Sequence, residues 1–184
     1  MIRERLIILD AESSVLALHM GENFKRLSPL LQKSHIGINK LEGTAIVKRG
    51  NIIARIICSL FGFPRENPKS KLRVDCEHTS DSMVWMRDFD GLKMESSFER
   101  QGEYLIEFLG PLSMYFKAVE KDGELHYLFI KTKFIGVFLP NFLSPQVVAS
   151  EKEVDGKYRF SVEVRMFWIG VVIAYSGELK VHSL

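Results

Sequence analysis

The strongest structural signal in the sequence is the stretch KYRFSVEVRM, residues 157–166. Its apolar and polar residues alternate, so that Tyr158 and Phe160 fall on one side while Arg159 and Ser161 fall on the other. A period of two is typical of a strand with one buried and one solvated face, as found in antiparallel sheets. The stretch therefore predicts a half-buried antiparallel strand.

The same alternation runs from residue 71 to the end of the chain and is interrupted by short turn sequences. They are Asp90-Gly91, Gln101-Gly102, Asp122-Gly123 and Asp155-Gly156, each between two alternating runs. Such pairs favour β-hairpins, and counting between them predicts about seven to nine strands. No helical pattern long enough for a parallel crossover separates the runs, so we expect a mainly antiparallel sheet. A sheet of this size protects its edges by curling, and we expect a barrel or half-barrel in a mainly β, α+β fold.

The first part of the chain has a different period. Residues 15–32 place apolar side chains three and four positions apart, which predicts helix. Gly21 and Pro29 interrupt the pattern and favour one or two short helices. Residues 36–47 then resemble a strand. We expect the helices to pack on one face or one end of the curled sheet.

A further helix is predicted for residues 52–61. Asn51 is suited to cap its first turn, and Gly62 and Pro64 follow its end. Isoleucine and leucine give this segment a wide apolar face and leave only a thin polar one. We expect that apolar face to cover the sheet.

Composition indicates a globular protein. The chain has 184 residues, of which 46% are apolar and 26% charged, as in ordinary single domains. We expect one domain over residues 16–184, whereas residues 1–15 are compatible with a strand, a tail or the remnant of a preceding domain. The formal net charge of +2 is too balanced to indicate nucleic acid or an anionic membrane as the main partner.

The sequence gives no sign of a membrane span, a secretory signal or a disulfide framework. No segment approaches the roughly 18 uninterrupted apolar residues of a transmembrane helix. Asp10 and Glu12 interrupt the apolar run near the N-terminus, and no small-residue cleavage site follows. Two cysteines, Cys58 and Cys76, are too few for a disulfide scaffold. We expect a location in the reducing cytoplasm.

Common catalytic and cofactor signatures are missing from the sequence. It has no glycine-rich nucleotide loop and no serine in a nucleophile elbow, so we expect no cofactor. Its five histidines are scattered without the spacing of metal ligands, so we expect no metal site. An enzyme would have to use residues that only the fold brings together.

Arg87 is the first candidate for a ligand-binding residue. It shares a strand face with Trp85 and Phe89, which directs its charge into apolar surroundings. A buried charge requires a partner, and Glu107 and Glu151 lie on apolar strand faces of their own. The group would anchor the polar end of a ligand, or it would form a structural ion pair that fixes strand register.

Three further residues are candidates for the site. Arg49 and Arg55 flank the start of the 52–61 helix, where they would hold an anion or pair locally. His35 lies at the boundary between a helix and a strand and would act either as an acid–base group or as a hydrogen-bonded structural residue.

Residues 134–145 form an unusually apolar segment that contains Pro140 and therefore does not suit a central strand. The segment is compatible with a lid, a loop that touches a membrane, or a surface for a partner. We favour a loop that folds back over the end of the barrel. Aromatic side chains on the concave face would line a cavity if the interior is not filled.

Over residues 16–179 the chain resembles a bacterial family known as domain of unknown function 4166. The resemblance rests on the order and spacing of landmarks across the chain. These are Phe24, Leu27, Pro29, His35, Gly43, Val47-Lys48-Arg49-Gly50, Ala54-Arg55, Pro64, Trp85-Met86-Arg87-Asp88-Phe89, Glu107-Phe108-Leu109-Gly110-Pro111, Gly136, Leu139-Pro140, Ala149-Ser150-Glu151, Gly170 and Tyr175-Ser176-Gly177. Members of the family occur alone or joined to other modules, such as saccharopine-dehydrogenase-like domains and membrane-embedded segments. The resemblance implies an accessory or binding domain and supplies no catalytic residues.

Three functions remain open from the sequence. The first is a non-catalytic module that binds an apolar or amphipathic small molecule, with Arg87 near its polar end. The second is an enzyme that uses His35 or the pair Glu107 and Glu151 for proton transfer. The third is an interaction domain that binds a protein partner or a second copy of itself.

Overall fold

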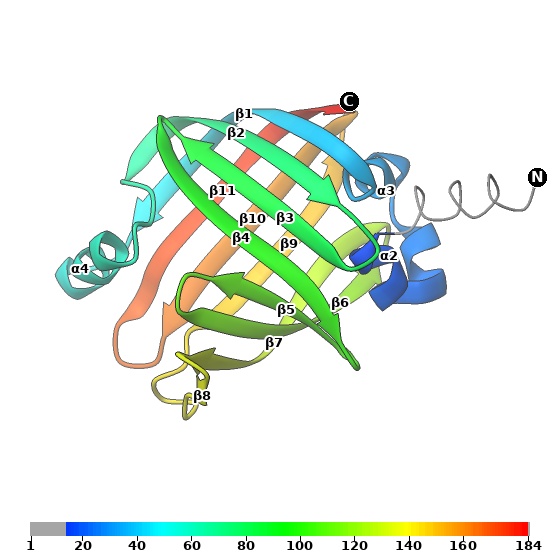
Figure 1. Ribbon diagram of the computed structural model, residues 1–184. Helices are drawn as coiled ribbons and strands as arrows, with labels where there is room; N and C mark the ends of the chain where they lie inside the picture. Colours follow the sequence, from blue (N-terminus) through cyan, green and yellow to red (C-terminus); the bar gives the residue numbers. More distant parts are fainter. Residues whose placement is uncertain (1–13, 184) are drawn as a thin grey trace, which may run out of the picture.

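The computed structural model describes residues 14–183. Residues 1–13 lie outside the described part. They include most of the unassigned segment 1–15 and the apolar run near the N-terminus. Ten strands form a closed barrel in which all neighbours are antiparallel (Figure 1). They are β1 (Gly37–Arg49), β2 (Asn67–His78), β3 (Ser82–Phe89), β4 (Leu92–Gln101), β5 (Tyr104–Leu109), β6 (Leu112–Lys121), β7 (Glu124–Phe134), β9 (Gln146–Val154), β10 (Lys157–Met166) and β11 (Gly170–Ser183). An additional short strand, β8 (Val137–Phe138), pairs with β7.

The expected curled antiparallel sheet is thus confirmed, and it is a closed barrel. Pairing of β1 with β11 joins the first strand to the last, and pairing of β6 with β7 completes the ring. Closure leaves none of the ten strands as an open edge. The part of the chain for which seven to nine strands are predicted contains nine of the ten barrel strands, β2 to β11, and β1 corresponds to the strand predicted separately for residues 36–47.

All four predicted turns connect neighbouring strands, and the backbone geometry of the three Asp-Gly pairs matches that of a hairpin turn. Asp90, Asp122 and Asp155 have φ values of 52°, 54° and 53°, and the glycine after each also has a positive φ. Two successive positive φ values match the twist of a hairpin and are accessible to an Asp-Gly pair. These dipeptides therefore reverse the chain without strain and set the length of the strands on either side.

The seam between β1 and β11 depends on small residues. A β-carbon at Gly43 would lie 2.1 Å from the carbonyl oxygen of Glu178, and one at Gly177 would lie 2.4 Å from that of Thr44. Only glycine permits this approach of the two backbones. Glycine at these two positions is therefore required for β1 and β11 to pair closely.

Three short helices close one end of the barrel (Figure 1). They are α2 (Val15–Met20), the 3-10 helix η1 (Gly21–Arg26) and α3 (Pro29–Ser34). The division occurs at Gly21 and Pro29, as predicted. Leu16 and Leu31 are fully buried by this packing, so the helices form a plug whose apolar face completes the core.

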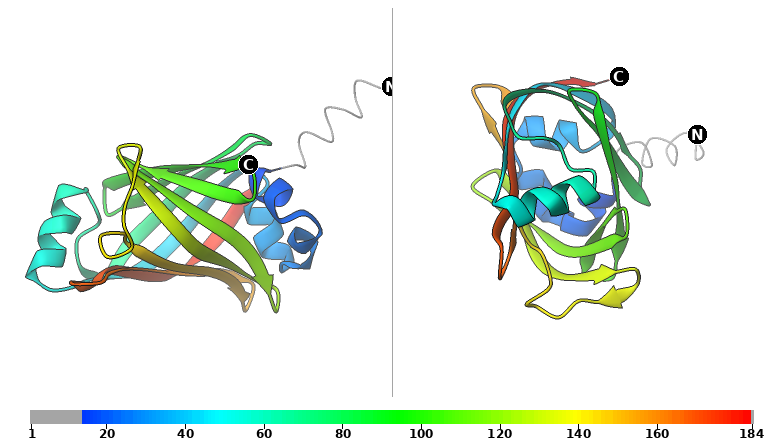
Figure 2. Two further views of the ribbon diagram at one scale, coloured as in Figure 1. Left: turned by 90° about the horizontal axis from the view of Figure 1, so that it is seen from below. Right: turned by 90° about the vertical axis from the view of Figure 1, so that its left-hand side faces the viewer.

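Helix α4 (Ile52–Leu60) lies across the opposite end of the barrel (Figure 2, right). The side chain of Asn51 accepts a hydrogen bond from the Ala54 amide at 3.1 Å, which confirms the predicted cap. The expected burial of the apolar face is wrong for most of it. Ala54 and Cys58 are buried, whereas Ile52 and Ile53 are exposed, because the short helix contacts the barrel through its small residues.

Within residues 14–183, no helix combines the length and apolarity that crossing a membrane requires.

Candidate functional site

Strand β3 directs Arg87 into the barrel. Trp85 and Phe89, two positions before and after it, are 6% and 3% exposed, so the alternation places all three side chains inside. Arg87 Nη1 donates a hydrogen bond to Ser96 Oγ at 2.8 Å, and its Cζ lies 5.3 Å from the centre of the Trp85 ring. The guanidinium is thus held against an aromatic face and a hydroxyl on β4.

Glu107 on β5 is the acidic neighbour of Arg87. Its Oε1 lies 3.8 Å from Arg87 Nη2, and both side chains are largely buried. Burial raises the pKa of Glu107, and the charge of Arg87 opposes that rise. Burial also opposes the charge of Arg87, but Tyr175 and Glu107 raise its pKa above the ordinary value, so the guanidinium stays charged.

Glu151 on β9 has partners other than the expected Arg87. Its Oε2 lies 2.6 Å from Nε2 of His35, and its Oε1 accepts a hydrogen bond from the Tyr127 hydroxyl at 3.2 Å. His35 ends α3 and is fully buried. The expected contact between Arg87 and Glu151 is therefore replaced by two separate pairs, because the helical plug brings its own partner to Glu151.

Several buried polar atoms beside these pairs have no hydrogen-bond partner in the described structure. They include Nε1 of Trp85 and Nδ1 of His35. Burial, followed by the nearby His35, lowers the pKa of His78 to about 2, so this imidazole is neutral. Burying such atoms without a hydrogen bond costs free energy. A water molecule or a polar ligand group that bonded to them would offset part of this cost.

Three adjoining cavities surround the Arg87 side chain. Their volumes are about 190, 60 and 40 Å³, and Arg87, Val162 and Tyr175 line all of them. The two smaller cavities reach Trp85 and Glu151. The largest is bounded by α4, by the segment 139–145 and by the end of β10, and its lining is mostly apolar. The interior therefore combines an apolar chamber near α4 with a charged inner wall.

The chemistry of this arrangement suits a molecule with two unlike ends. A cavity of about 150 Å³ lined by aliphatic side chains is large enough for a benzene-sized guest, so the largest chamber accepts a small apolar group. The guanidinium of Arg87 suits an anionic or carbonyl group. Among the described residues, no group of three or more histidine, cysteine or acidic side chains is placed to hold a metal ion.

The structure does not bring Arg49 and Arg55 to this site. Arg49 donates to the carbonyl oxygens of Pro64 and Phe63 at 2.9 and 2.6 Å, which ties down the loop after α4. Arg55 forms an exposed ion pair with Glu66 at 2.9 Å. The local pairing that the sequence left open for both arginines is therefore what the structure contains.

Ser96 is not identified as a site residue from the sequence, and Tyr127 and Tyr175 are expected there only as members of the aromatic set that would line a cavity on the concave face. Tyr127, Tyr175 and Ser96 all contact the charged groups or line the cavities. Strand alternation alone could have placed them inside, since each lies on an inward-facing position of its strand. Their proximity to Arg87 and Glu151 depends on the register between strands, which the sequence pattern does not reveal.

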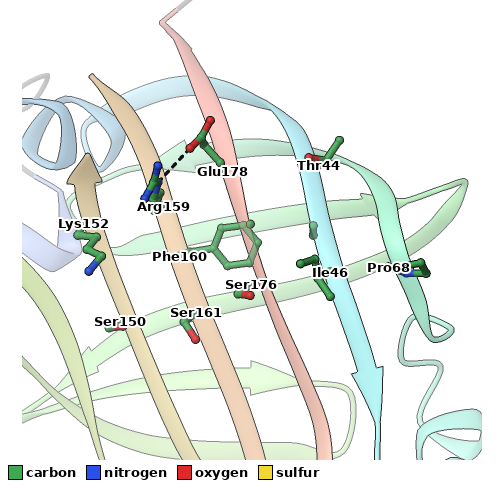
Figure 3. Close-up of a pocket in the computed structure, with 12 residues that line it drawn as sticks. Thr44, Ile46, Pro68, Ser150, Lys152, Arg159, Phe160, Ser161, Ser176 and Glu178 are labelled. Atoms are coloured by element: carbon green, nitrogen blue, oxygen red, sulfur yellow. Dashed lines mark hydrogen bonds and ion pairs between the residues drawn. The ribbon is translucent and has the colours of Figure 1, made fainter. Parts of the chain in front are cut away.

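The outer wall of the barrel also has a hollow, of about 380 Å³ (Figure 3). It lies over β1, β9, β10 and β11, where Ile46, Lys152 and Ser161 are solvent-exposed. The ion pair between Arg159 and Glu178, at 2.9 Å, lies in this hollow. Because its charges are already paired on an open surface, we place the candidate site inside the barrel.

Comparisons with known proteins point to a single family. No curated protein and no solved structure matches the chain. The model of the family described as "Domain of unknown function (DUF4166)" matches residues 27–179. That range runs from the helical plug to β11 and contains His35, Arg87, Glu107 and Glu151. The chain therefore belongs to the DUF4166 family.

Proposed function

We propose that the barrel is a non-catalytic module that binds one small apolar or amphipathic molecule. The apolar part of the ligand would occupy the chamber of about 190 Å³ next to α4. Its polar end would face Arg87. The observation that carries the proposal is the position of the buried Arg87–Glu107 pair at the point where the three cavities meet.

The hydrogen bonding of Arg87 supports a ligand with an acceptor group. A guanidinium has five N–H donors, and Ser96 uses one of them. Glu107 is 3.8 Å away, beyond hydrogen-bond length. A structural ion pair gains most from close bidentate contact, which this pair lacks. A carboxylate or phosphate on the ligand would supply the missing acceptors.

The size of the chamber restricts the ligand. Pockets for drug-sized molecules usually enclose about 300–1,000 Å³, and the chamber is smaller. A short aliphatic chain or a single ring is the better fit. The two thiols, Cys58 and Cys76, are free and buried, and we place the protein in a reducing compartment such as the cytoplasm.

Calorimetric titration with octanoate and with octanol tests the proposal, since the two probes share a chain and differ in charge. We expect octanoate to bind about tenfold more tightly or better, a difference of about 1.4 kcal/mol. Arg87→Met should remove this preference. Arg55→Met, which removes an exposed arginine of the same size, should leave it intact.

A second variant keeps the test meaningful if Arg87→Met does not fold. Val162→Phe places a larger side chain where the cavities meet and leaves Arg87 in place. Loss of binding of both probes in Val162→Phe is expected. The proposal is wrong if the unmodified protein binds neither probe, or if Val162→Phe and Arg87→Met bind both probes as the unmodified protein does.

A second candidate function rests on Glu151. Its carboxylate lines the two smaller cavities and is oriented by His35 and Tyr127. A buried carboxylate beside an imidazole suits general acid–base catalysis. Mass spectrometry of the ligand released after incubation separates the two functions. A binding module returns the ligand unchanged, whereas a product that Glu151→Gln abolishes would favour an enzyme.

A further inference from the structure

We propose that the end of the barrel that carries α4 docks on the surface of an anionic lipid bilayer. The proposal concerns an exposed apolar surface and does not depend on the proposed ligand binding. Three segments form this surface, which we call the apolar rim: α4 with the residues up to 61, residues 135–143, and residues 167–168.

The topology brings the three segments to one end of the molecule. In an antiparallel barrel, alternate connections lie at the same end. The β1–β2 connection contains α4, the β7–β9 connection contains residues 135–145, and the β10–β11 connection contains residues 167–169. Phe61 and Leu143 line the same cavity as Met166, the last residue of β10 before Phe167, so the three segments lie around one opening. Figure 2 (right) views this end.

The apolar rim exposes large side chains to water. Phe167 and Trp168 at the tip of the β10–β11 hairpin are 73% and 76% exposed. The centres of their two rings lie 4.8 Å apart, in an edge-to-face arrangement. The remaining exposed members are Ile52, Ile53, Ile56, Leu60, Phe61, Ile135, Val137, Phe138, Phe142 and Leu143. A cluster of this size is unusual for a free surface and marks an interaction site.

The opposite end of the barrel does not share this feature. Its connections include Gly102-Glu103, Asp122-Gly123 and Asp155-Gly156, which are short and polar. Ile38, at the start of β1, lies among polar neighbours, and the exposed wall residues Leu128 and Val148 pair with each other across β7 and β9; exposed apolar residues in such small numbers are ordinary for soluble proteins. The asymmetry between the two ends therefore indicates a function at the α4 end.

The charge around the apolar rim favours an anionic partner. Residues 50–66, 131–145 and 163–169 contain five basic and two acidic side chains. Lys131 and Lys133 place their ammonium groups 4.6 and 4.5 Å from the Phe138 ring, directly beside the apolar side chains. Basic groups next to aliphatic and aromatic residues match the junction between anionic headgroups and acyl chains.

The shape of the apolar rim favours a bilayer over a protein. Its apolar side chains come from three separate projections, and the cavity opens among them. A fluid bilayer adapts to separate insertions, whereas a protein partner needs a closely complementary surface. Tryptophan and phenylalanine at a projecting tip are also typical of the membrane interface.

Vesicle co-sedimentation tests the proposal with the whole protein. One vesicle preparation is phosphatidylcholine, and the other is an equimolar mixture of phosphatidylcholine and phosphatidylglycerol. We expect binding to the mixed vesicles, weaker binding to neutral ones, and a blue shift of Trp168 fluorescence. The double variant Phe167→Ser with Trp168→Ser should bind about tenfold more weakly or worse, since two aromatic side chains no longer insert.

The matched control is Leu18→Ser with Ile38→Ser, which removes two exposed apolar residues at the other end of the barrel. It should bind as the unmodified protein does. The proposal is overturned if the unmodified protein stays in solution with both vesicles, or if both double variants bind equally. It is also overturned if light scattering shows a dimer that only the rim variant disrupts, without vesicle binding. Octanoate binding by the rim variant reports separately on the interior site.

Discussion

His35 Nε2 lies 2.6 Å from Glu151 Oε2, although the two residues are 116 positions apart in the sequence. His35 ends the helical plug and Glu151 belongs to the barrel wall. The contact therefore joins the two parts of the fold through buried polar atoms. Removing one member of such a pair leaves the other without compensation in a region that excludes water.

We expect His35→Phe to lower the free energy of unfolding by about 3–5 kcal/mol, because it strands the Glu151 carboxylate in the interior. Glu151→Gln should cost less, since an amide can still hydrogen-bond to His35 and Tyr127. Urea denaturation followed by circular dichroism measures both. The control is Lys25→Ala, which breaks the exposed pair with Glu22 and should change stability by less than about 1 kcal/mol. Equal effects of His35→Phe and Lys25→Ala would contradict the prediction.

The candidate site was only partly predictable from the sequence, and this pair shows why. The sequence points to both His35 and Glu151, each from its local surroundings. Their mutual contact depends on how the plug sits in the barrel, and no local pattern encodes that position. The inward direction of the Arg87 side chain is easier to predict, because strand alternation fixes it once Trp85 and Phe89 are assigned to the core.

Gly43→Ala should destabilise the barrel at its seam. The added β-carbon would lie 2.1 Å from the carbonyl oxygen of Glu178, and backbone atoms cannot move aside as a flexible side chain does. We expect a loss of about 1–3 kcal/mol or more in the free energy of unfolding. Thr44→Ala, at the adjacent exposed position, should change stability by no more than about 0.5 kcal/mol. Thermal unfolding curves compare the two, and a Gly43→Ala protein as stable as Thr44→Ala would disprove the steric argument.

The fold was more predictable than the site because its signals are local. An Asp-Gly pair such as Asp90-Gly91 needs only its own dihedral angles to reverse the chain, and the four predicted turns all formed. The exposure of α4 was not predictable in the same way. Apolar spacing identifies a helix, but whether Ile52 and Ile53 are covered depends on what the barrel end offers them.

The two cysteines should be inert in the folded protein. Cys58 and Cys76 are 0% and 2% exposed, and burial raises the pKa of the Cys76 thiol to about 12. The thiolate is the reactive form, so a disulfide reagent at pH 8 should label neither residue until denaturant is added. Asp81→Cys, in the exposed β2–β3 turn, provides a control that should react at once. Rapid labelling of the unmodified folded protein would contradict this expectation.

His78 should make the fold sensitive to acid. Burial and the neighbouring His35 lower its pKa from 6.5 to about 2, so the folded protein resists protonation that the unfolded chain accepts. Between these two pKa values the unfolded state binds more protons, and stability therefore falls as pH decreases below about 6.5. One such group contributes a slope of up to about 1.4 kcal/mol per pH unit.

Glu107 acts in the opposite direction. Its pKa is raised in the folded state, so its contribution to stability is lost as pH rises above 4.5 through the folded value. Glu107 is present in both His78→Phe and the unmodified protein, so its contribution to the pH dependence cancels when the two are compared. We expect His78→Phe to unfold with a weaker dependence on pH between roughly 4.5 and 6.5, by about one proton. Urea denaturation at several pH values gives the slopes. His182→Phe changes an exposed histidine and should retain the slope of the unmodified protein, whereas an unchanged slope in His78→Phe would mean that this imidazole does not govern the acid response.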